Sequence, residues 1–145
     1  MPRALLDVNV VIALLDASHV FHVRAHEWWA AHRTEGWCSC PLTENGVIRV
    51  MSQPAYSRKV TFSIPQLTQS LVTFQQQTDH EFWADTLSLT DSVHFDGRYI
   101  LSHRHVTDVY LLGLAVRHDG WLVTFDQGIP RAAVVGAQDH HLCVL

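Results

Sequence analysis

The segment ALLDVNVVIALL, residues 4–15, decides the fold class of this chain. Its first residues, 4–8, form an apolar run that predicts a short buried strand ending at Asp7. Asn9 is a candidate N-cap for an apolar helix over residues 10–15, because its side chain can accept a hydrogen bond from a free helix amide. A buried strand that passes at once into a helix is typical of α/β proteins.

The same alternation continues to the end of the chain. Further strands are expected at residues 37–40, 121–125 and 142–145. Helices are expected at residues 18–32, 41–51, from Pro65 onward and at 108–118. Ser18 is the expected N-cap of the first of these helices, and Thr107 is that of the last. Residues 81–84 fit either another strand or one irregular turn. Short apolar strands without clean alternation indicate burial on both faces. The sequence therefore predicts a single α/β domain, residues 1–145, with a mainly parallel central sheet flanked by helices in three layers.

The composition narrows the class of protein. A length of 145 residues with 48% hydrophobic residues suits one globular domain. Ten basic against fourteen acidic side chains argue against nucleic-acid binding through a general basic coat, although they leave room for an enzyme that contacts nucleic acid locally. The apolar runs are too short to span a bilayer, no secretory signal is visible, and three cysteines give no disulfide framework. We expect a cytoplasmic protein without a membrane contact.

Four carboxylates are expected to meet at one edge of the sheet. Asp7 ends the first strand, and Asp126 follows the last strand but one. Glu44 lies in the first turn of the helix after the second strand, and Asp108 opens a helix that leads into a later strand. Ligands of parallel α/β sheets bind outside the carboxyl ends of the strands, where all four positions fall. Taken singly, each acid is equally explained as a helix-terminal or turn residue.

Acids gathered in this way predict a bound cation. Carboxylates that face one another repel, and one or more would take up a proton unless a cation lies among them. Oxygen ligands favour Mg²⁺ or Mn²⁺, and such an ion can activate water and hold a phosphodiester during in-line attack. Asn9 and Thr124, each two residues from an acid, could steady the carboxylates or contact phosphate. A helix cap and a strand hydroxyl are the alternative explanations for these two residues.

Four motifs resemble those of PIN domains, and most closely those of the VapC-type toxins of bacterial toxin–antitoxin pairs. Residues 5–14 (LLDVNVVIAL) resemble the first motif and residues 43–50 (TENGVIRV) the second. Residues 106–111 (VTDVYL) and 122–126 (LVTFD) resemble the third and the fourth, in the expected order along the chain. One such motif alone is a weak signal, whereas four in order are a strong one.

The resemblance implies a PIN-like fold and a function. Its members are Mg²⁺-dependent endoribonucleases that cleave specific RNA, and it marks Asp7, Glu44, Asp108 and Asp126 as catalytic and metal-binding residues. It also implies inhibition by a cognate VapB-type antitoxin and a homodimer. Of Trp28 and Trp29, which cannot both face the core of one helix, one is expected at such a contact or half-covered by a neighbouring helix.

Two other functions compete with this interpretation. A haloacid-dehalogenase-like phosphatase also begins with an acid after an apolar strand, but it carries a second acid two residues later, where this chain has Asn9. A PIN-like module that binds RNA or protein without cleaving is the other alternative, and the presence of all four acids argues against it.

The histidines give weaker signals. His22 and His26, with His19 nearby, have a spacing that could bind zinc, but partly packed histidines explain it as well. His103 and His105 lie shortly before the third acid and could approach RNA.

Overall fold

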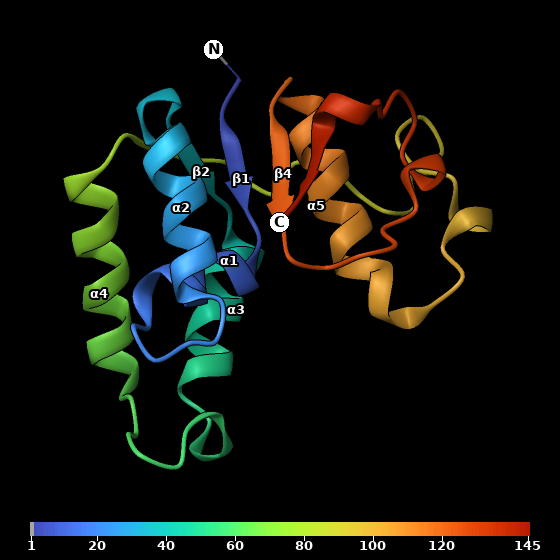
Figure 1. Ribbon diagram of the computed structural model, residues 1–145. Helices are drawn as coiled ribbons and strands as arrows, with labels where there is room; N and C mark the ends of the chain where they lie inside the picture. Colours follow the sequence, from blue (N-terminus) through green and yellow to red (C-terminus); the bar gives the residue numbers. More distant parts are fainter. Residues whose placement is uncertain (1) are drawn as a thin grey trace.

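A computed structural model describes residues 2–145 (Figure 1). Its strands are β1 (Ala4–Leu6), β2 (Trp37–Ser39), β3 (His80–Phe82), β4 (Trp121–Thr124) and β5 (Leu142–Val144), and its α-helices are α1 (Val8–Leu15), α2 (His22–His32), α3 (Pro41–Met51), α4 (Ile64–Gln77) and α5 (Val106–Arg117). Within the described residues, no helix has the length and apolar character needed to cross a membrane.

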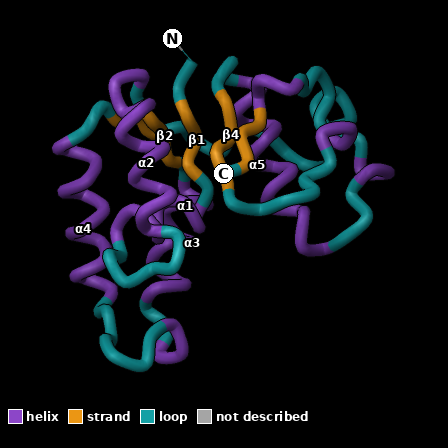
Figure 2. The backbone as a smooth tube through the Cα atoms, viewed as in Figure 1, coloured by secondary structure: helices purple, strands orange, loops and turns teal. Residues whose placement is uncertain are grey.

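The five strands form one parallel sheet in the order β3-β2-β1-β4-β5. Figure 2 shows the strands side by side among the helices. The chain runs outward from β1 through β2 to β3 and then returns to the other side of β1 for β4 and β5. The carboxyl ends of β1 and β4 therefore flank the point where the direction of winding reverses, which is the usual ligand site of such sheets. The predicted fold class is confirmed, and the undecided segment near residue 81 forms a strand, β3.

Alternate residues of the central strands face two separate hydrophobic cores. Ala4 and Leu6 of β1 pack with apolar residues of α1, α2, α3 and α4. Leu5 points the other way, into a core built mainly with α5. In Figure 1 the first four helices gather on one side of β1 and α5 lies on the other. Because both faces of the strands are covered, the sequence shows no alternation of apolar and polar residues there.

Two of the predicted caps near the N-terminus are wrong. Asp7, rather than Asn9, caps α1, and the backbone N–H of Val8 donates to Asp7 Oδ1 at 2.7 Å. Ser18 does not begin α2, which starts at His22 instead. The backbone N–H of Ser18 donates to Asp16 Oδ1 at 2.9 Å, so that residues 16–21 turn back as a loop before the helix.

The cap predicted for α5 is also wrong, whereas α3 begins and ends as predicted. Thr107 lies inside α5, because the 3-10 turn His103–His105 runs directly into the helix and places its start at Val106. Helix α3 spans Pro41–Met51, the predicted range.

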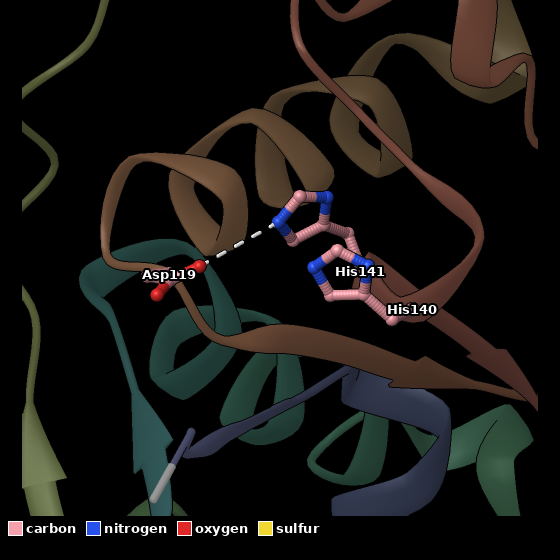
Figure 3. Close-up of side chains that lie close together, drawn as sticks. All are labelled: Asp119, His140 and His141. Atoms are coloured by element: carbon pink, nitrogen blue, oxygen red, sulfur yellow. Dashed lines mark ion pairs between the residues drawn. The ribbon is translucent and has the colours of Figure 1, made fainter.

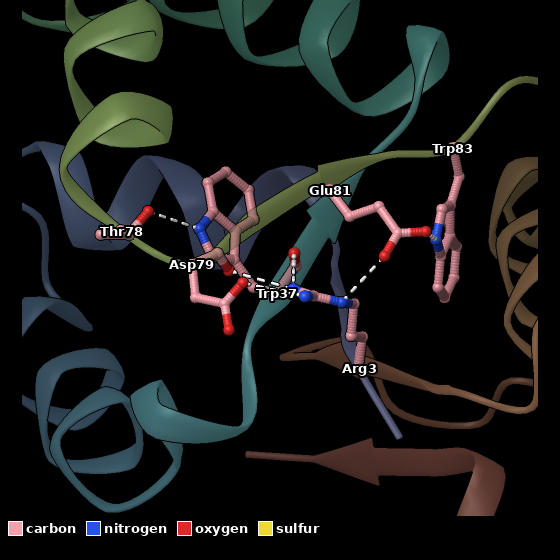
Figure 4. A network of polar contacts seen from close by, with 6 residues as sticks. All are labelled: Arg3, Trp37, Thr78, Asp79, Glu81 and Trp83. Atoms are coloured by element: carbon pink, nitrogen blue, oxygen red, sulfur yellow. Dashed lines mark hydrogen bonds and ion pairs between the residues drawn. The ribbon is translucent and has the colours of Figure 1, made fainter. Parts of the chain in front are cut away.

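Arg3 links β1 to β3 through ion pairs at the amino-terminal edge of the sheet (Figure 4). Its guanidinium donates to Asp79 Oδ1 at 2.8 Å and lies 2.9 Å from Glu81 Oε2, so it ties the chain before β1 to both sides of the start of β3. The indole N–H of Trp37 donates to Thr78 Oγ1 at 2.8 Å beside it. The acids are half exposed, so each ion pair contributes only about 0–1 kcal/mol. The guanidinium of Arg3 nevertheless pairs with both acids, so each charged group of this network has a partner of opposite charge.

Candidate metal centre

Three of the four predicted carboxylates meet at the carboxyl edge of the sheet. Asp7 directly follows β1, and Asp126 lies just beyond β4, whose Val123 is in register with Leu6 of β1. Asp108 reaches the same place from the first turn of α5. One carboxylate oxygen from each acid lies within 4.8 Å of the others. We call Asp7, Asp108 and Asp126 the three-acid group.

Thr124 and Asn9 hold this group in place. The hydroxyl of Thr124 donates to Asp7 Oδ2 at 2.7 Å, and the backbone N–H of Asp126 donates to the same hydroxyl oxygen at 2.9 Å. The Asn9 amide donates to Thr124 Oγ1 at 3.5 Å, and its carbonyl oxygen accepts from the backbone N–H of Phe125 at 3.3 Å. Thr124 is fully buried, so it forms a fixed link between the acids that follow β1 and β4.

The three-acid group carries negative charge that the protein does not neutralise. Burial raises the pKa of Asp7, although bonds from Thr124 and Val8 oppose this shift. Burial, reinforced by the charges of Asp7 and Asp126, raises the pKa of Asp108 to about 7. No Arg or Lys side chain in residues 2–145 pairs with any of the three acids. A cation bound among these acids would relieve the repulsion that raises the pKa of Asp108, and no Arg or Lys side chain among the described residues does so.

Glu44 does not join the three-acid group. It lies in the first turn of α3 as predicted, but its Oε2 accepts from the Ser39 hydroxyl at 2.5 Å and from the Gln75 amide at 2.9 Å. Ser39 ends β2, so Glu44 is at the expected edge of the sheet, and its bond to Gln75 turns it toward α4. The partner from α4 is 31 residues away in sequence, which no local motif reveals.

An open cleft of about 340 Å³ lies against the group, lined by Asp7, Val8, Asn9, Ile12, His19, Val50, Tyr56 and Asp126. Sequence reasoning assigned neither His19 nor Tyr56 to the site, because both come from loops with no motif. The Tyr56 hydroxyl donates to Asp16 Oδ2 at 2.5 Å. Burial and this bond raise the pKa of Tyr56, so its phenol stays protonated.

Comparison with known proteins identifies the family to which the chain belongs. The model of the PIN domain matches residues 4–135. Ribonuclease VapC44 of Mycobacterium tuberculosis H37Rv is 48% identical over 143 residues, covering 99% of each chain. Ribonuclease VapC38 of the same strain is 43% identical over 126 residues, covering 87% of this chain and 86% of its own length. A solved structure of VapBC2 from Rickettsia felis bound to a promoter DNA fragment aligns over 85% of this chain and 86% of that chain, with 13% identity and a TM-score of 0.49.

The chain belongs to the PIN-domain family. Within the family it is a VapC-type toxin ribonuclease, as its four motifs predicted.

His105 lies at the side of the three-acid group in this PIN domain. Its Nδ1 is 3.8 Å from Asp108 Oδ2 and has no hydrogen-bond partner among the described residues. His103, in the same 3-10 turn, is exposed. Of the two histidines expected near RNA, His105 is therefore the one beside an acid of the group.

The histidines and tryptophans of α2 have structural contacts in this PIN domain. His22 Nδ1 lies 2.7 Å from the carbonyl oxygen of Ala13, and His26 Nε2 lies 3.0 Å from that of Leu14. A carbonyl oxygen only accepts, so these two ring nitrogens carry the protons. Neither His22 nor His26 belongs to a group of three or more close metal-ligating side chains among the described residues. Trp28 is buried, and Trp29 is half covered by α4, where it packs edge-on against Phe74.

A second candidate metal group, Asp119, His140 and His141, lies at the opposite, amino-terminal edge of the sheet (Figure 3). His141 Nε2 is 3.9 Å from Asp119 Oδ1, and His141 Nδ1 accepts from the backbone N–H of Gln138 at 2.9 Å. Burial lowers the pKa of His141, so the ring is neutral and has one lone pair, which the Gln138 bond uses. Nε2 therefore carries the proton and points it toward Asp119. We assign this group to the local fold of the loop, because a metal ion would need that nitrogen deprotonated.

Proposed function

We propose that this protein is a Mg²⁺-dependent endoribonuclease, with Mn²⁺ as a working substitute, that acts through Asp7, Glu44, Asp108 and Asp126. The observation that carries the proposal is the convergence of three carboxylates within 4.8 Å without an Arg or Lys partner among the described residues. The donor set consists of oxygens alone, as a hard divalent ion prefers.

The residues of the site have separable tasks. Asp7, Asp108 and Asp126 would hold the ion, and Glu44 would add a fourth carboxylate from α3 at the same edge of the sheet. A bound ion of this kind supplies an activated water and polarises the phosphodiester. Thr124 orients Asp7 by its 2.7 Å bond and fixes the backbone of Asp126. These links preorganise the acids before RNA arrives.

The competing functions fit the contacts less well. In a phosphatase of the haloacid-dehalogenase kind, the residue two after the nucleophile protonates the leaving group. Here Asn9 cannot supply that proton, and both ends of its amide are bound to Thr124 and Phe125. A silent binding module has no need to gather three mutually repelling acids and to bury two of them, Asp7 and Asp108, which costs stability unless an ion is bound.

The biological role we propose is that of a toxin held inactive by a VapB-type antitoxin. The support is the similarity to proteins named as VapC ribonucleases, together with an acidic pocket that a basic side chain of a partner would complement. A homodimer, which the resemblance implies, belongs to the same proposal. We expect growth arrest on expression of the chain alone and relief by Asp7→Asn. Equal growth with the two proteins, at equal soluble levels, would contradict the toxin role.

The RNA substrate is proposed to be cut at few sites. A net charge of −4 allows little nonspecific tracking along phosphates, and unpaired loops present bases that a local site can hold. We therefore propose cleavage within loops of a structured RNA such as a tRNA or ribosomal RNA. Sequencing of 5′ ends from cells that express the protein tests this point, and cuts spread over unrelated transcripts would contradict it.

The direct test of the enzymatic proposal is RNA cleavage against metal concentration. Purified protein should cleave total bacterial RNA in Mg²⁺ or Mn²⁺ and should stop on addition of EDTA. Asp7→Asn and Asp108→Asn should abolish cleavage while the fold persists. Undiminished cleavage in excess EDTA would overturn the metal requirement.

A further inference from the structure

The cleft beside the three-acid group contains a histidine ring N–H that the fold leaves free. Asn9 directs one of its two amide N–H groups toward Thr124, and Tyr56 uses its hydroxyl proton toward Asp16. His19 lines the same cleft and accepts a bond at Nδ1 from the backbone N–H of Phe21, at 3.0 Å. The accepting nitrogen holds no proton, so the proton of the neutral ring is on Nε2.

The loop that carries His19 is braced on both sides of the cleft. On one side, Asp16 accepts from the Tyr56 hydroxyl and from the Ser18 amide, and the backbone N–H of His19 donates to the Asp16 carbonyl at 3.0 Å. On the other side, the ring of Phe21 stacks on Phe125 at a centroid distance of 4.7 Å. Phe125 directly precedes Asp126 of the three-acid group. His19 is thus held in a fixed tautomer and tied to the acidic site through Phe21.

The cleft around His19 is lined by acidic side chains, so a phosphate that binds there needs hydrogen-bond donors. Asp7 and Asp126 line one wall, and Val8, Ile12 and Val50 add apolar surface. Among the described residues that line the cleft, none is Arg or Lys. For an RNA phosphate that approaches the acids, a bound metal ion would balance the charge and the ring N–H of His19 is placed to donate a hydrogen bond.

We propose that His19 is a substrate-contacting residue whose Nε2–H donates to a phosphate oxygen of the RNA bound at the three-acid group. This inference rests on the proposed endoribonuclease function and adds a residue to it. His19 does not ligate the ion in this arrangement, so its loss should affect RNA turnover and leave metal binding unchanged.

Two substitutions of His19 distinguish a hydrogen bond to RNA from a purely structural role of the side chain. In His19→Asn, the side-chain oxygen can still accept from Phe21, as Nδ1 does, but the reach of Nε2 is lost. In His19→Gln, the amide nitrogen occupies the place of Nε2 and can donate. The matched control is His26→Asn, whose ring contacts the carbonyl of Leu14 outside the cleft.

The experiment measures kcat/KM on total bacterial RNA in Mn²⁺, the dissociation constant for Mn²⁺, and the melting temperature of each protein. A hydrogen bond to a charged group is worth about 10- to 100-fold, so His19→Asn should lose about that much in kcat/KM. His19→Gln should recover most of the loss, and Mn²⁺ affinity should match the wild type in both. His26→Asn should retain wild-type turnover.

Four results would overturn the proposal. Turnover of folded His19→Asn near the wild-type rate would show that no contact is made. A parallel loss of Mn²⁺ affinity would make His19 part of the metal centre. If the substitution to Asn unfolds the chain, the Gln variant decides, because a folded but inactive His19→Gln contradicts the donor role. Wild-type protein that cleaves no RNA in Mn²⁺ would overturn the endoribonuclease function itself, and the role of His19 with it.

Discussion

The two ends of the sheet each gather three potential metal ligands, and they differ in what surrounds those ligands. At the carboxyl end, Asp7 and Asp108 are buried with raised pKa values and have no Arg or Lys partner among the described residues. At the amino end, His141 has its proton placed by Gln138, and Arg3 nearby is paired with Asp79 and Glu81. Proximity of ligand atoms is therefore a poor criterion alone. Uncompensated charge and free lone pairs distinguish an ion site from a hydrogen-bonded cluster.

The largest expected difference between the two ends is in catalysis. Asp108→Asn should lower RNA cleavage in Mg²⁺ by about 100-fold or more, because it removes an ionised ligand from the ion. Asp119→Asn, the same change at the amino end, should leave the rate within about twofold, since surface positions away from a site contribute little. Initial rates of cleavage at equal protein concentration measure both. Equal losses of cleavage rate in the two variants would contradict the assignment of the metal site to the carboxyl end of the sheet.

A smaller difference is expected in metal binding against pH. The pKa of Asp108 is raised to about 7, so an ion that binds below this pH must displace a proton. Mn²⁺ affinity should fall about fivefold between pH 7 and pH 6, and it should level off above pH 8. Titration calorimetry with Mn²⁺ on the wild type and on Asp119→Asn should give the same curve. A pH dependence that disappears in Asp119→Asn would place the ion at the wrong end of the sheet.

A further difference is expected in the free energy of unfolding of the metal-free protein, because Asp108 lies at the carboxyl end of the sheet with a raised pKa. The folded pKa of Asp108 lies above its ordinary value of 3.8, so this residue costs increasing stability as pH rises from 3.8 through about 7. In EDTA at pH 8, Asp108→Asn should therefore raise the free energy of unfolding, by on the order of 1 kcal/mol or about 2–4 °C in melting temperature. The gain should shrink at pH 5. A large drop at pH 8 would mean that Asp108 is needed for the fold.

The smallest effect, of opposite sign, is expected at the amino end. The folded pKa of His141 lies below 6.5, so its contribution to stability is present above pH 6.5 and is lost as pH falls through the folded value. His141→Ala should lower stability at pH 8 by about 0.5–1.5 kcal/mol, because the Gln138 amide loses its acceptor. His140→Ala, a change at the exposed neighbour, is the control for thermal melts. A stabilised His141→Ala would contradict the assigned tautomer.

The comparison also shows which parts of the molecule the sequence could predict. Asp7 and Asp126 follow from the rule that parallel strands end at one edge, because each acid stands directly after an apolar run. Asp108 follows because a helix that leads into a parallel strand starts at that same edge. These inferences need only the order of elements, and the sequence contains that order.

Contacts that depend on packing were not predictable in this way. Glu44 occupies the predicted helix turn, yet Gln75 of α4 and Ser39 bind its carboxylate outside the three-acid group. Asp7 and Asn9 were both possible caps for α1, and only the link from Asn9 to Thr124 and Phe125 decides between them. In each case the partner is far away in sequence, so no local pattern records it.

The pairing of β1 with β4 also determines when the three-acid group can form during synthesis of the chain. Asp7 and Thr124 are 117 positions apart, and their bond closes a loop that contains most of the chain. Contacts of such long range form late in folding, since the entropy of a large loop must first be overcome. A nascent chain that ends before Asp126 lacks one acid of the group, and β4 then has no β5 to cover its outer edge. The complete three-acid group, on a sheet with both neighbours of β4 in place, therefore forms only after β5 has been synthesised.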